Sequence, residues 1–292
     1  MIDVKTMATQ PGKIRALGSD VDALTLDEAI AAIVGWLGVL MEPSERLEPA
    51  QRLEPAQRAS EPAPCMYVVT PNLDHAVLLK SNERLRASYQ HAKMVLADGM
   101  PLVWASRLFG RPLPERVAGS DLGPGVLASA PAGTRVFLLG ASESSSQGAA
   151  QFIENNYPHV EVAGRISPPF GFEKSAEWSQ KITDEIASSG THLILVGLGA
   201  PKQELWVYDH RERLPNTVAL CIGATIDFLS GEKPRAPRWA QRSGLEWFHR
   251  MLSDPGRLVV RYARDAAHLP SLLLADARFR PDQVPNQPPA GD

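Results

Sequence analysis

From Cys65 onward the sequence alternates short apolar runs, rich in β-branched residues, with longer segments whose apolar residues recur at helical spacing. Strands that lead into helices in this way pair in parallel, because each helix carries the chain back across one face of the sheet. The pattern therefore predicts an α/β fold built on a doubly wound, mostly parallel sheet. The predicted strands are residues 65–70, 94–97, 135–139, 160–164, 192–196 and 218–222.

Helical signals fill the gaps between these runs and also precede them. Thr25 and Glu28 have the spacing of a capping box, and apolar residues then recur at helical period from Leu26 to Leu40. Sheets of this kind bind ligands beyond the carboxyl ends of their strands, so informative residues are expected just after each strand. The predicted helices are residues 26–41, 73–90, 100–109, 121–130, 144–156, 175–188 and 202–213.

Two proline-rich segments are predicted to be disordered. Leu-Glu-Pro-Ala-Gln-Arg occurs twice in tandem within residues 42–64, a segment that holds five prolines. Proline fixes φ and removes amide donors, so we interpret 42–64 as a disordered insertion without chemistry. Residues 281–292 are also rich in proline and are predicted to be disordered.

Charge and cysteine content exclude several classes of protein. The net charge is −3, but Lys233–Asp265 alone carries +5, which leaves −8 for the rest. Nucleic-acid binding by the whole chain is therefore not expected. Cys65 and Cys221 are predicted to be reduced core residues. There is no apolar leader and no run long enough to cross a bilayer, which predicts a cytoplasmic chain that is at most peripheral on a membrane.

Polar residues follow three of the predicted strands. These stretches are Thr70-Pro-Asn72, Ala97-Asp98-Gly99 and Gly197–Glu204, and the fold brings them to one edge of the sheet. A carboxylate such as Asp98 can act there as a general base, while the adjacent glycine lets a substrate approach the backbone. The competing interpretation is that Asp98 only caps the helix that starts near Met100.

The Gly197–Glu204 stretch forms a strand, a glycine-rich turn and a helix start, the geometry that offers amides and a helix dipole to phosphate. Lys202 takes the place of the third glycine of a dinucleotide fingerprint, and the P-loop sequence is also absent. Gly140 begins a similar but weaker turn. Asp20 and Asp22 have the spacing of a metal-binding carboxylate pair, but we interpret them as a solvated turn.

The C-terminal part has a more specific pattern. Asp254 followed by Pro255 predicts the start of a helix. Arg257, Arg261 and Arg264 then share one helix face, which suits capture of phosphate or pyrophosphate, although a solvated face gives the same pattern. Further along, leucines 269, 272, 273 and 274 either pack on the body or enter a bilayer interface.

Seven stretches, in order over about residues 20 to 265, resemble the WecG/TagA/CpsF family of bacterial glycosyltransferases. Each is weak alone, but seven in sequence are hard to obtain by chance. The insertion falls between them and affects none. They are Val69-Thr-Pro-Asn72, Leu96-Ala-Asp-Gly99, Pro114-Glu-Arg-Val-Ala-Gly-Ser-Asp121, Val196-Gly-Leu-Gly-Ala-Pro-Lys-Gln-Glu204, Arg235-Ala-Pro237, Gly244-Leu-Glu-Trp247 and Asp254-Pro-Gly-Arg257.

The resemblance implies a Rossmann-like inverting glycosyltransferase that moves a sugar from a UDP-sugar onto a polyprenyl-pyrophosphate-linked acceptor. The donor would be UDP-N-acetylmannosamine, its uronic acid, UDP-glucose or a similar sugar, and the product a surface polysaccharide or cell-wall polymer. It implies no cofactor and no divalent metal, and a peripheral location at the inner face of the plasma membrane. The oligomeric state, a homo-oligomer included, is left open.

The resemblance also implies roles for individual residues. Asp98 is the expected catalytic base. Arg116 is expected to contact phosphate or to position the acceptor. The other expected substrate-binding residues are Thr70, Asn72, Gln203, Arg250, Arg257 and Arg261, and the expected nucleotide-binding residues are Gly140, Gly197, Gly199, Lys202 and Asp227.

In domain terms, residues 1–41 hold the N-terminal segment and first helix, and 65–247 the rest of the catalytic domain. Residues 248–280 form a basic helical appendage for membrane and acceptor binding. Two other readings stay open: a nucleotide-dependent oxidoreductase, and a non-catalytic membrane adaptor whose basic tail binds anionic lipid.

Overall fold

The computed structural model describes residues 12–42, 63–237, 239–240, 246–253 and 255–278. Apart from residues 42, 63 and 64, the predicted insertion lies outside this described part, and so does the tail 281–292. The disorder expected for these two segments therefore stays a prediction.

A six-stranded, all-parallel sheet forms the centre of the molecule, in the spatial order β4-β3-β8-β7-β5-β6. All six strands expected from the sequence are present, which confirms the α/β doubly wound prediction. Their alternate side chains enter two different core clusters, as with Tyr67 on one face and Val68 on the other. The strands are β3 (Met66–Val69), β4 (Met94–Val95), β5 (Thr134–Gly140), β6 (Val160–Ile166), β7 (Leu193–Gly197) and β8 (Val218–Cys221).

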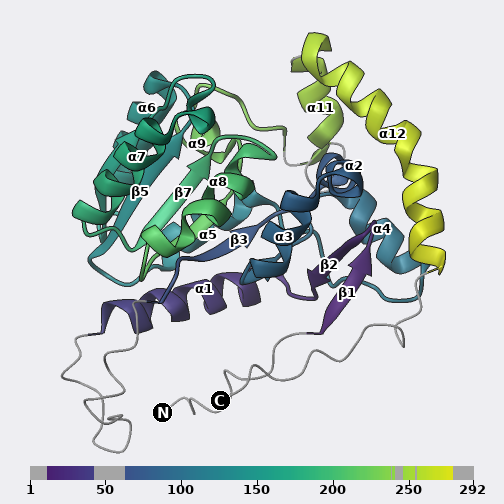
Figure 1. Cartoon of the computed structure of the whole chain (residues 1–292), viewed down its shortest axis with the longest axis horizontal. Coiled ribbons are helices and arrows are strands. Elements are labelled where there is room, and N and C mark those ends of the chain that lie inside the picture. The colour runs from purple at the N-terminus through teal and green to yellow at the C-terminus, as the bar shows by residue number, and fades with distance from the viewer. Residues whose placement is uncertain (1–11, 43–62, 238, 241–245, 254, 279–292) are drawn as a thin grey trace, which may run out of the picture.

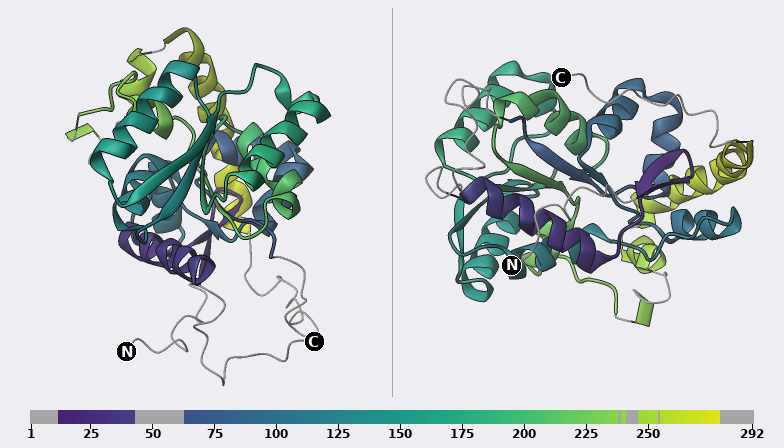
Figure 2. Two further views of the ribbon diagram at one scale, coloured as in Figure 1. Left: turned by 90° about the vertical axis from the view of Figure 1, so that its left-hand side faces the viewer. Right: turned by 90° about the horizontal axis from the view of Figure 1, so that it is seen from below.

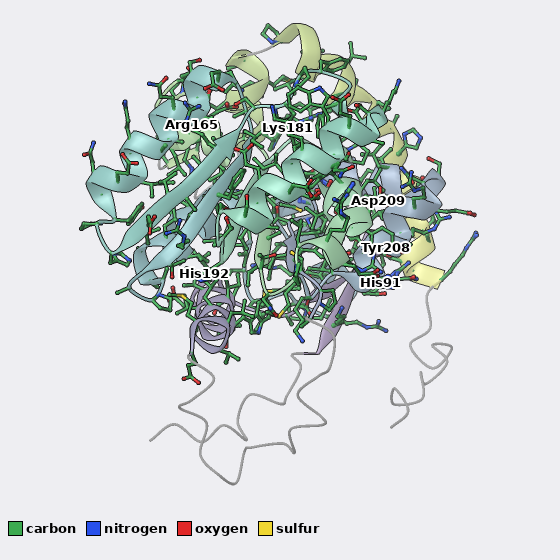
Figure 3. All side chains as sticks on the ribbon, turned by 60° about the vertical axis from the view of Figure 1, so that its left-hand side comes forward. His91, Arg165, Lys181, His192, Tyr208 and Asp209 are labelled. Carbon is green, nitrogen blue, oxygen red and sulfur yellow. The ribbon has the colours of Figure 1, made fainter. Side chains whose placement is uncertain are left out.

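Helices cover both faces of this sheet (Figures 1 and 2). One face packs against α1 (Leu26–Met41), α5 (Gly119–Ser129), α6 (Glu143–Asn156) and α9 (Thr225–Leu229). The helices on the other face are α2 (Leu73–Ser81), α3 (Glu83–His91), α4 (Met100–Leu108), α7 (Ala176–Ser188) and α8 (Lys202–His210). The rings of His91 and Tyr208 lie side by side on the outer surface of α3 and α8, 5.1 Å between centroids (Figure 3).

The helix predictions hold except at one point. The capping box of Thr25 and Glu28 is formed at the start of α1. The single helix expected over 73–90 is instead two helices, α2 and α3, because the chain breaks at Asn82. The Asn82 side chain accepts a hydrogen bond from the amide of Leu85 and caps α3, an interaction by which asparagine competes with a continuous helix.

An antiparallel hairpin of β1 (Lys13–Ala16) and β2 (Ser19–Asp22) precedes α1 and was not expected. The interpretation of Asp20 and Asp22 as a solvated turn is wrong, because both lie in β2. Asp22 is buried, and its carboxylate accepts a hydrogen bond of 2.7 Å from the amide of Val95 in β4. Burial raises the pKa of Asp22, and this hydrogen bond opposes the rise. Asp22 therefore ties the hairpin to the edge strand of the main sheet.

The two cysteines are free and buried, as predicted. Burial raises the pKa of Cys65 to about 12 and that of Cys221 well above its ordinary value. Because the thiolate is the reactive form, neither thiol is expected to react with a disulfide reagent in the native protein at pH 8. Two equivalents should react in denaturant, whereas rapid labelling of the native chain would contradict this core placement.

The C-terminal arm consists of α11 (Glu246–Ser253) and α12 (Pro255–Arg278). Helix α12 begins at Pro255 as predicted and runs along α2 (Figure 1). Leu272 is buried and Leu269 and Leu273 pack on the same core, while Leu274 is exposed, so three of the four leucines pack on the body. Near the far end of α12, the Asp276 carboxylate accepts hydrogen bonds from the amides of Leu17 and Gly18 in the hairpin turn. Among the described helices, none has both the length and the apolar character needed to cross a bilayer.

Candidate active site

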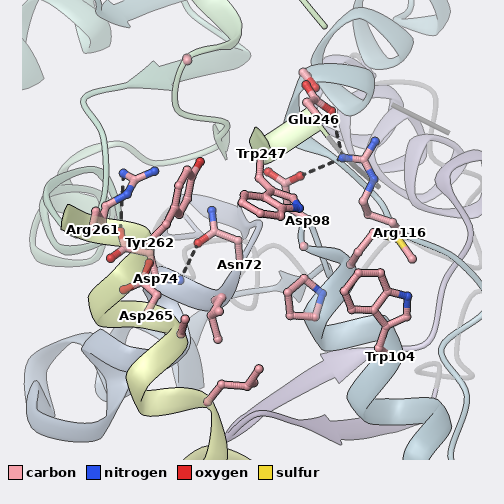
Figure 4. A pocket seen from close by; sticks show the side chains of 18 of the residues that line it. Asn72, Asp74, Asp98, Trp104, Arg116, Glu246, Trp247, Arg261, Tyr262 and Asp265 are labelled. Carbon is pink, nitrogen blue, oxygen red and sulfur yellow. Dashed lines mark hydrogen bonds and ion pairs between the residues drawn. The ribbon is translucent and has the colours of Figure 1, made fainter. Parts of the chain in front are cut away.

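A cavity of about 270 Å³ lies between the carboxyl ends of β3, β4 and β8 and the C-terminal arm (Figure 4). The arm supplies one wall through Trp247, Arg261 and Tyr262, while the strand-end loops supply Asn72 and Asp98. Aromatic and aliphatic side chains make up much of the rest, which suits a site that excludes water around a few polar groups. These further lining residues include Met100, Pro101, Trp104, Ile222, Phe228 and Leu269.

Asp98 and Arg116 face each other in this cavity (Figure 4). The Asp98 carboxylate lies 3.7 Å from the Arg116 guanidinium, which also pairs with Glu246 at 3.1 Å and with Asp121 at 3.8 Å. Arg235 in turn lies 2.7 Å from Asp121 and 3.8 Å from Glu246. Two guanidinium groups are thus shared among the three carboxylates of Asp98, Asp121 and Glu246.

The local sequence explains why Asp98 reaches the cavity. It lies three residues after the end of β4, and its amide donates a hydrogen bond to the carbonyl of Pro71 in the loop after β3. A Cβ on Gly99 would lie 3.2 Å from the Cα of Asn72, so a glycine there allows the two strand-end loops to touch. The N-cap of α4 is Gly99, which places Asp98 one residue before the capping position. The geometry therefore favours the interpretation of Asp98 as a site residue over that of a simple cap.

Two arginines of α12, Arg261 and Arg264, lie against α2, where both pair with Asp74. Arg261 lies 3.8 Å from the Asp74 carboxylate, and Arg264 also pairs with Asp74 and with Asp265. Arg261 lines the cavity, with its guanidinium over the Tyr262 ring. At Arg261 and Arg264, the predicted arginine face of α12 is therefore directed at α2. The side chains of Arg250 and Arg257 lie outside the described residues, so their expected roles stay predictions.

Gly140 and Gly197 lie together at the ends of β5 and β7, where they are register partners. A Cβ on Gly140 would lie 2.6 Å from the backbone of Gly197, and Gly140 has φ +109°, so only glycine fits there. The connections leaving β5 and β7 run to opposite sides of the sheet, which makes this point a topological switch. Ligands of doubly wound folds bind in such a crevice.

The loop after β7 is held together by Gln203. The buried Gln203 side chain accepts hydrogen bonds of 3.2 Å from the amides of Gly199 and Gly223, and so joins the loops after β7 and β8. The Gly199 amide is therefore occupied in this structure rather than free for phosphate, since the loop must satisfy its own donors. Lys202 lies nearby, 3.0 Å from Glu173 and above the exposed Phe170 ring.

Two other expected ligand residues have partners away from the cavity. The Thr70 hydroxyl is buried and donates to the carbonyl of Cys221 across β3 and β8. Asp227 is buried in α9 and pairs with Lys233. The cavity wall thus gathers Asn72, Asp98, Arg116 and Arg261 from the expected set.

Several residues of the site were not assigned a role from the sequence. Asp121, Arg235 and Glu246 stand inside the motif stretches, but motif order does not show that they share one ion-pair network. Trp104 and Asp74 lie within helices that the sequence predicted, and no motif or spacing marked them as site residues. Within the described part of the chain, no group of three or more His, Cys, Asp or Glu side chains has the arrangement of a metal site.

The fold places the candidate base, Asp98, at the carboxyl edge of a parallel sheet, where α/β proteins bind their ligands. Residues 14–283 match the glycosyl transferase WecG/TagA/CpsF family, most of the chain, and the chain belongs to this family of glycosyltransferases. The expected class of enzyme, a hexosyltransferase, is thereby confirmed.

Two curated relatives carry a more specific name. The chain is 33% identical over 192 residues to the N-acetylglucosaminyldiphosphoundecaprenol N-acetyl-beta-D-mannosaminyltransferase of Bacillus spizizenii, which covers 65% of this chain and 72% of that protein. It is 32% identical over 167 residues to the protein of the same name in Bacillus subtilis, covering 57% of this chain and 63% of the relative.

Proposed function

We propose that this glycosyltransferase moves a sugar from a UDP-sugar to a polyprenyl-diphosphate-linked acceptor in surface polysaccharide or cell-wall polymer synthesis. The observation that carries the proposal is the cavity in which Asp98, Arg116 and Arg261 meet under the C-terminal arm. The names of the two relatives, which act on a diphosphoundecaprenol-linked sugar, support the acceptor class.

In this proposal the Asp98 carboxylate takes the proton of the acceptor hydroxyl as its oxygen attacks the anomeric carbon of the donor. The bond from that carbon to UDP breaks on the opposite face, so the configuration inverts, and the electron pair leaves with the diphosphate. Cations and amides that face this developing charge lower the barrier more than they stabilise the bound donor. Arg116 is the proposed cation closest to the base.

The nucleotide is proposed to lie over the β5–β7 switch point, with Gly140, Gly197, Gly199 and Lys202 near its diphosphate and Asp227 toward the uracil. The support for this placement is that β5 and β7 are neighbours whose connections leave on opposite sides of the sheet, the position where doubly wound folds bind ligands. Gln203 would then act on the loop rather than on the sugar.

Transfer without a divalent metal or a cofactor is part of the same proposal. Its support is that Asp98, Asp121 and Glu246 each face a guanidinium in the described structure. Guanidinium groups can meet the charge of a leaving diphosphate directly.

We also propose that the enzyme is peripheral on the inner face of the cytoplasmic membrane, where the lipid-linked acceptor lies. Exposed apolar side chains gather on the C-terminal arm, and such groups gain free energy at a bilayer interface. The residues are Phe248, Leu252, Val259 and Val260.

The nucleotide preference separates this proposal from the oxidoreductase and adaptor readings. Adding UDP at about 100 times its Kd should stabilise the protein by about 2.7 kcal/mol and raise its melting temperature, whereas NAD should not. Incubation with a polyprenyl-diphosphate sugar and a panel of UDP-sugars should release UDP with one donor. Stabilisation by NAD, or liposome binding with no transfer from any donor, would overturn the proposal.

A further inference from the structure

The amide of Asn72 is held by an unusual number of contacts on its oxygen. Its Oδ1 accepts hydrogen bonds from the amides of Asp74 and His75, at 3.1 and 3.4 Å, and lies 3.0 Å from Nδ1 of His75. These contacts occupy the side-chain oxygen, and the side-chain nitrogen is directed into the cavity (Figure 4). Asn72 is thereby set as a hydrogen-bond donor to whatever the cavity binds.

His75 is buried and continues this contact into the core. Its Nε2 lies 3.2 Å from Oε1 of Glu204, a side chain with no exposed surface, at the start of α8. The same oxygen accepts a 2.8 Å hydrogen bond from Gln203, while Oε2 is buried with no hydrogen-bond partner in the described residues. A carboxylate this deep is costly unless a cation compensates it, and His75 is the group placed to do so.

The protonation of His75 decides whether its ring adds a hydrogen bond to the Asn72 side chain. Because Nε2 must carry a proton to meet Glu204, a second proton on Nδ1 makes an imidazolium, which donates to Oδ1 of Asn72. A neutral ring instead accepts at Nδ1 from the backbone N–H of Asn72, 3.3 Å away, and presents a lone pair to Oδ1. The imidazolium therefore adds a third hydrogen bond to Oδ1 of Asn72, beside those from the two backbone amides, and the neutral ring does not.

The groups that face His75 favour the charged form. Burial lowers its pKa, but the hydrogen bond and charge of Glu204, followed by the charges of Asp74 and Asp98, raise the pKa above its ordinary value of 6.5. The remaining neighbour is the buried Tyr89, whose ring centroid lies 6.5 Å away and whose pKa burial raises well above its ordinary value, so it stays neutral.

From this chain of contacts we infer that the buried pair of His75 and Glu204 positions Asn72 for the acceptor sugar. Neither residue lines the cavity, so both act through Asn72 as positioning residues rather than as catalytic residues. The inference rests on the proposed function, because it takes the cavity as the acceptor site.

Glu204→Gln tests this, since it keeps the size of the side chain and an oxygen for Gln203 while it removes the charge that protonates His75. At pH 6, below the ordinary pKa of histidine, the wild-type ring is charged, while burial keeps the ring of the variant neutral. The variant should there raise the KM for the lipid-linked acceptor about tenfold, the effect of one lost hydrogen bond, and leave the donor KM within twofold. Above the raised pKa of His75 in the wild type both rings are neutral, and the ratio of variant to wild-type KM should fall below threefold. A ratio that does not change with pH would overturn the inference.

A double-mutant cycle distinguishes this inference from the proposed function. Asn72→Ser keeps a capping oxygen for α2 but removes the amide donor, and it should raise the acceptor KM about tenfold. Adding Glu204→Gln to it should then cause no further rise. If Asn72→Ser leaves the acceptor KM unchanged, the acceptor site is wrong; if both changes raise it independently, only the positioning role is wrong.

Glu212→Gln is a matched control, because Glu212 is exposed and pairs only locally with Arg211 at 3.0 Å. It should leave both KM values unchanged. Should Glu204→Gln fail to fold, nitrogen NMR of labelled histidine in the wild type still decides the matter. The signal absent from a His75→Gln spectrum should show two protonated ring nitrogens at pH 6, and a neutral ring there would overturn the inference.

Discussion

Replacing Asp98 by asparagine is expected to lower the rate of sugar transfer by a factor on the order of 10² to 10⁴, the usual contribution of a general base. The amide keeps the size and position of the side chain but cannot take the proton of the acceptor hydroxyl. Since Asp98 lies in the cavity and not in the loops after β5 and β7, UDP should still bind with nearly unchanged affinity. Turnover can be followed as UDP release and UDP affinity by calorimetry.

The control for this variant is Asp209→Asn, because Asp209 lies on the outer end of α8 and pairs with Arg84 at 2.7 Å (Figure 3). That change removes the same charge far from the cavity and should leave transfer unchanged. Normal transfer by Asp98→Asn would remove the base assignment, whereas loss of UDP binding together with transfer would mean that Asp98 serves the donor.

Ending the chain after Trp247 should reduce transfer to the lipid-linked acceptor by at least about a hundredfold, since groups that position a substrate commonly contribute that much. The truncation removes Arg261, Tyr262, Asp265 and Leu269 from the cavity wall. The sheet and the helices on both its faces remain, so we expect a folded body with a lower melting temperature.

Arg261→Gln complements the truncation, because it keeps α12 while removing the cation that shares Asp74 with Arg264. Transfer should fall for this variant as well, with circular dichroism unchanged. Full turnover of a lipid-linked acceptor by the truncated chain would show that the C-terminal arm has no part in the site.

The main sheet could be predicted because its strands are buried on both faces and read as continuous apolar runs. The hairpin of β1 and β2 could not, since its strands carry charged residues between the apolar ones and contain no continuous apolar run. Asn82 interrupts a segment with an otherwise helical pattern through a capping contact three residues ahead, which a periodicity argument does not weigh.

The positions of Asp98 and Asn72 followed from the rule that ligands bind at the carboxyl ends of strands. The long-range pairs that surround these two residues could not be predicted in this way. Arg116 meets Glu246 across 130 positions of sequence, and His75 meets Glu204 across 129. Contacts of this range depend on how α11 and α8 dock, so the sequence could mark the stretches that hold these residues without showing which side chains pair. The occupied Gly199 amide is a similar case, because its partner Gln203 lies one turn further along the same segment.

The product of the reaction tests the central claim most directly. Wild-type protein would be incubated with a synthetic polyprenyl-diphosphate-linked N-acetylglucosamine and the UDP-sugar that it accepts, and the lipid product analysed by mass spectrometry and NMR. The proposed mechanism predicts one added sugar on the lipid-linked acceptor, with inverted anomeric configuration, and one UDP for each sugar transferred. Release of UDP and free sugar without a lipid product, or a product with retained configuration, would contradict it.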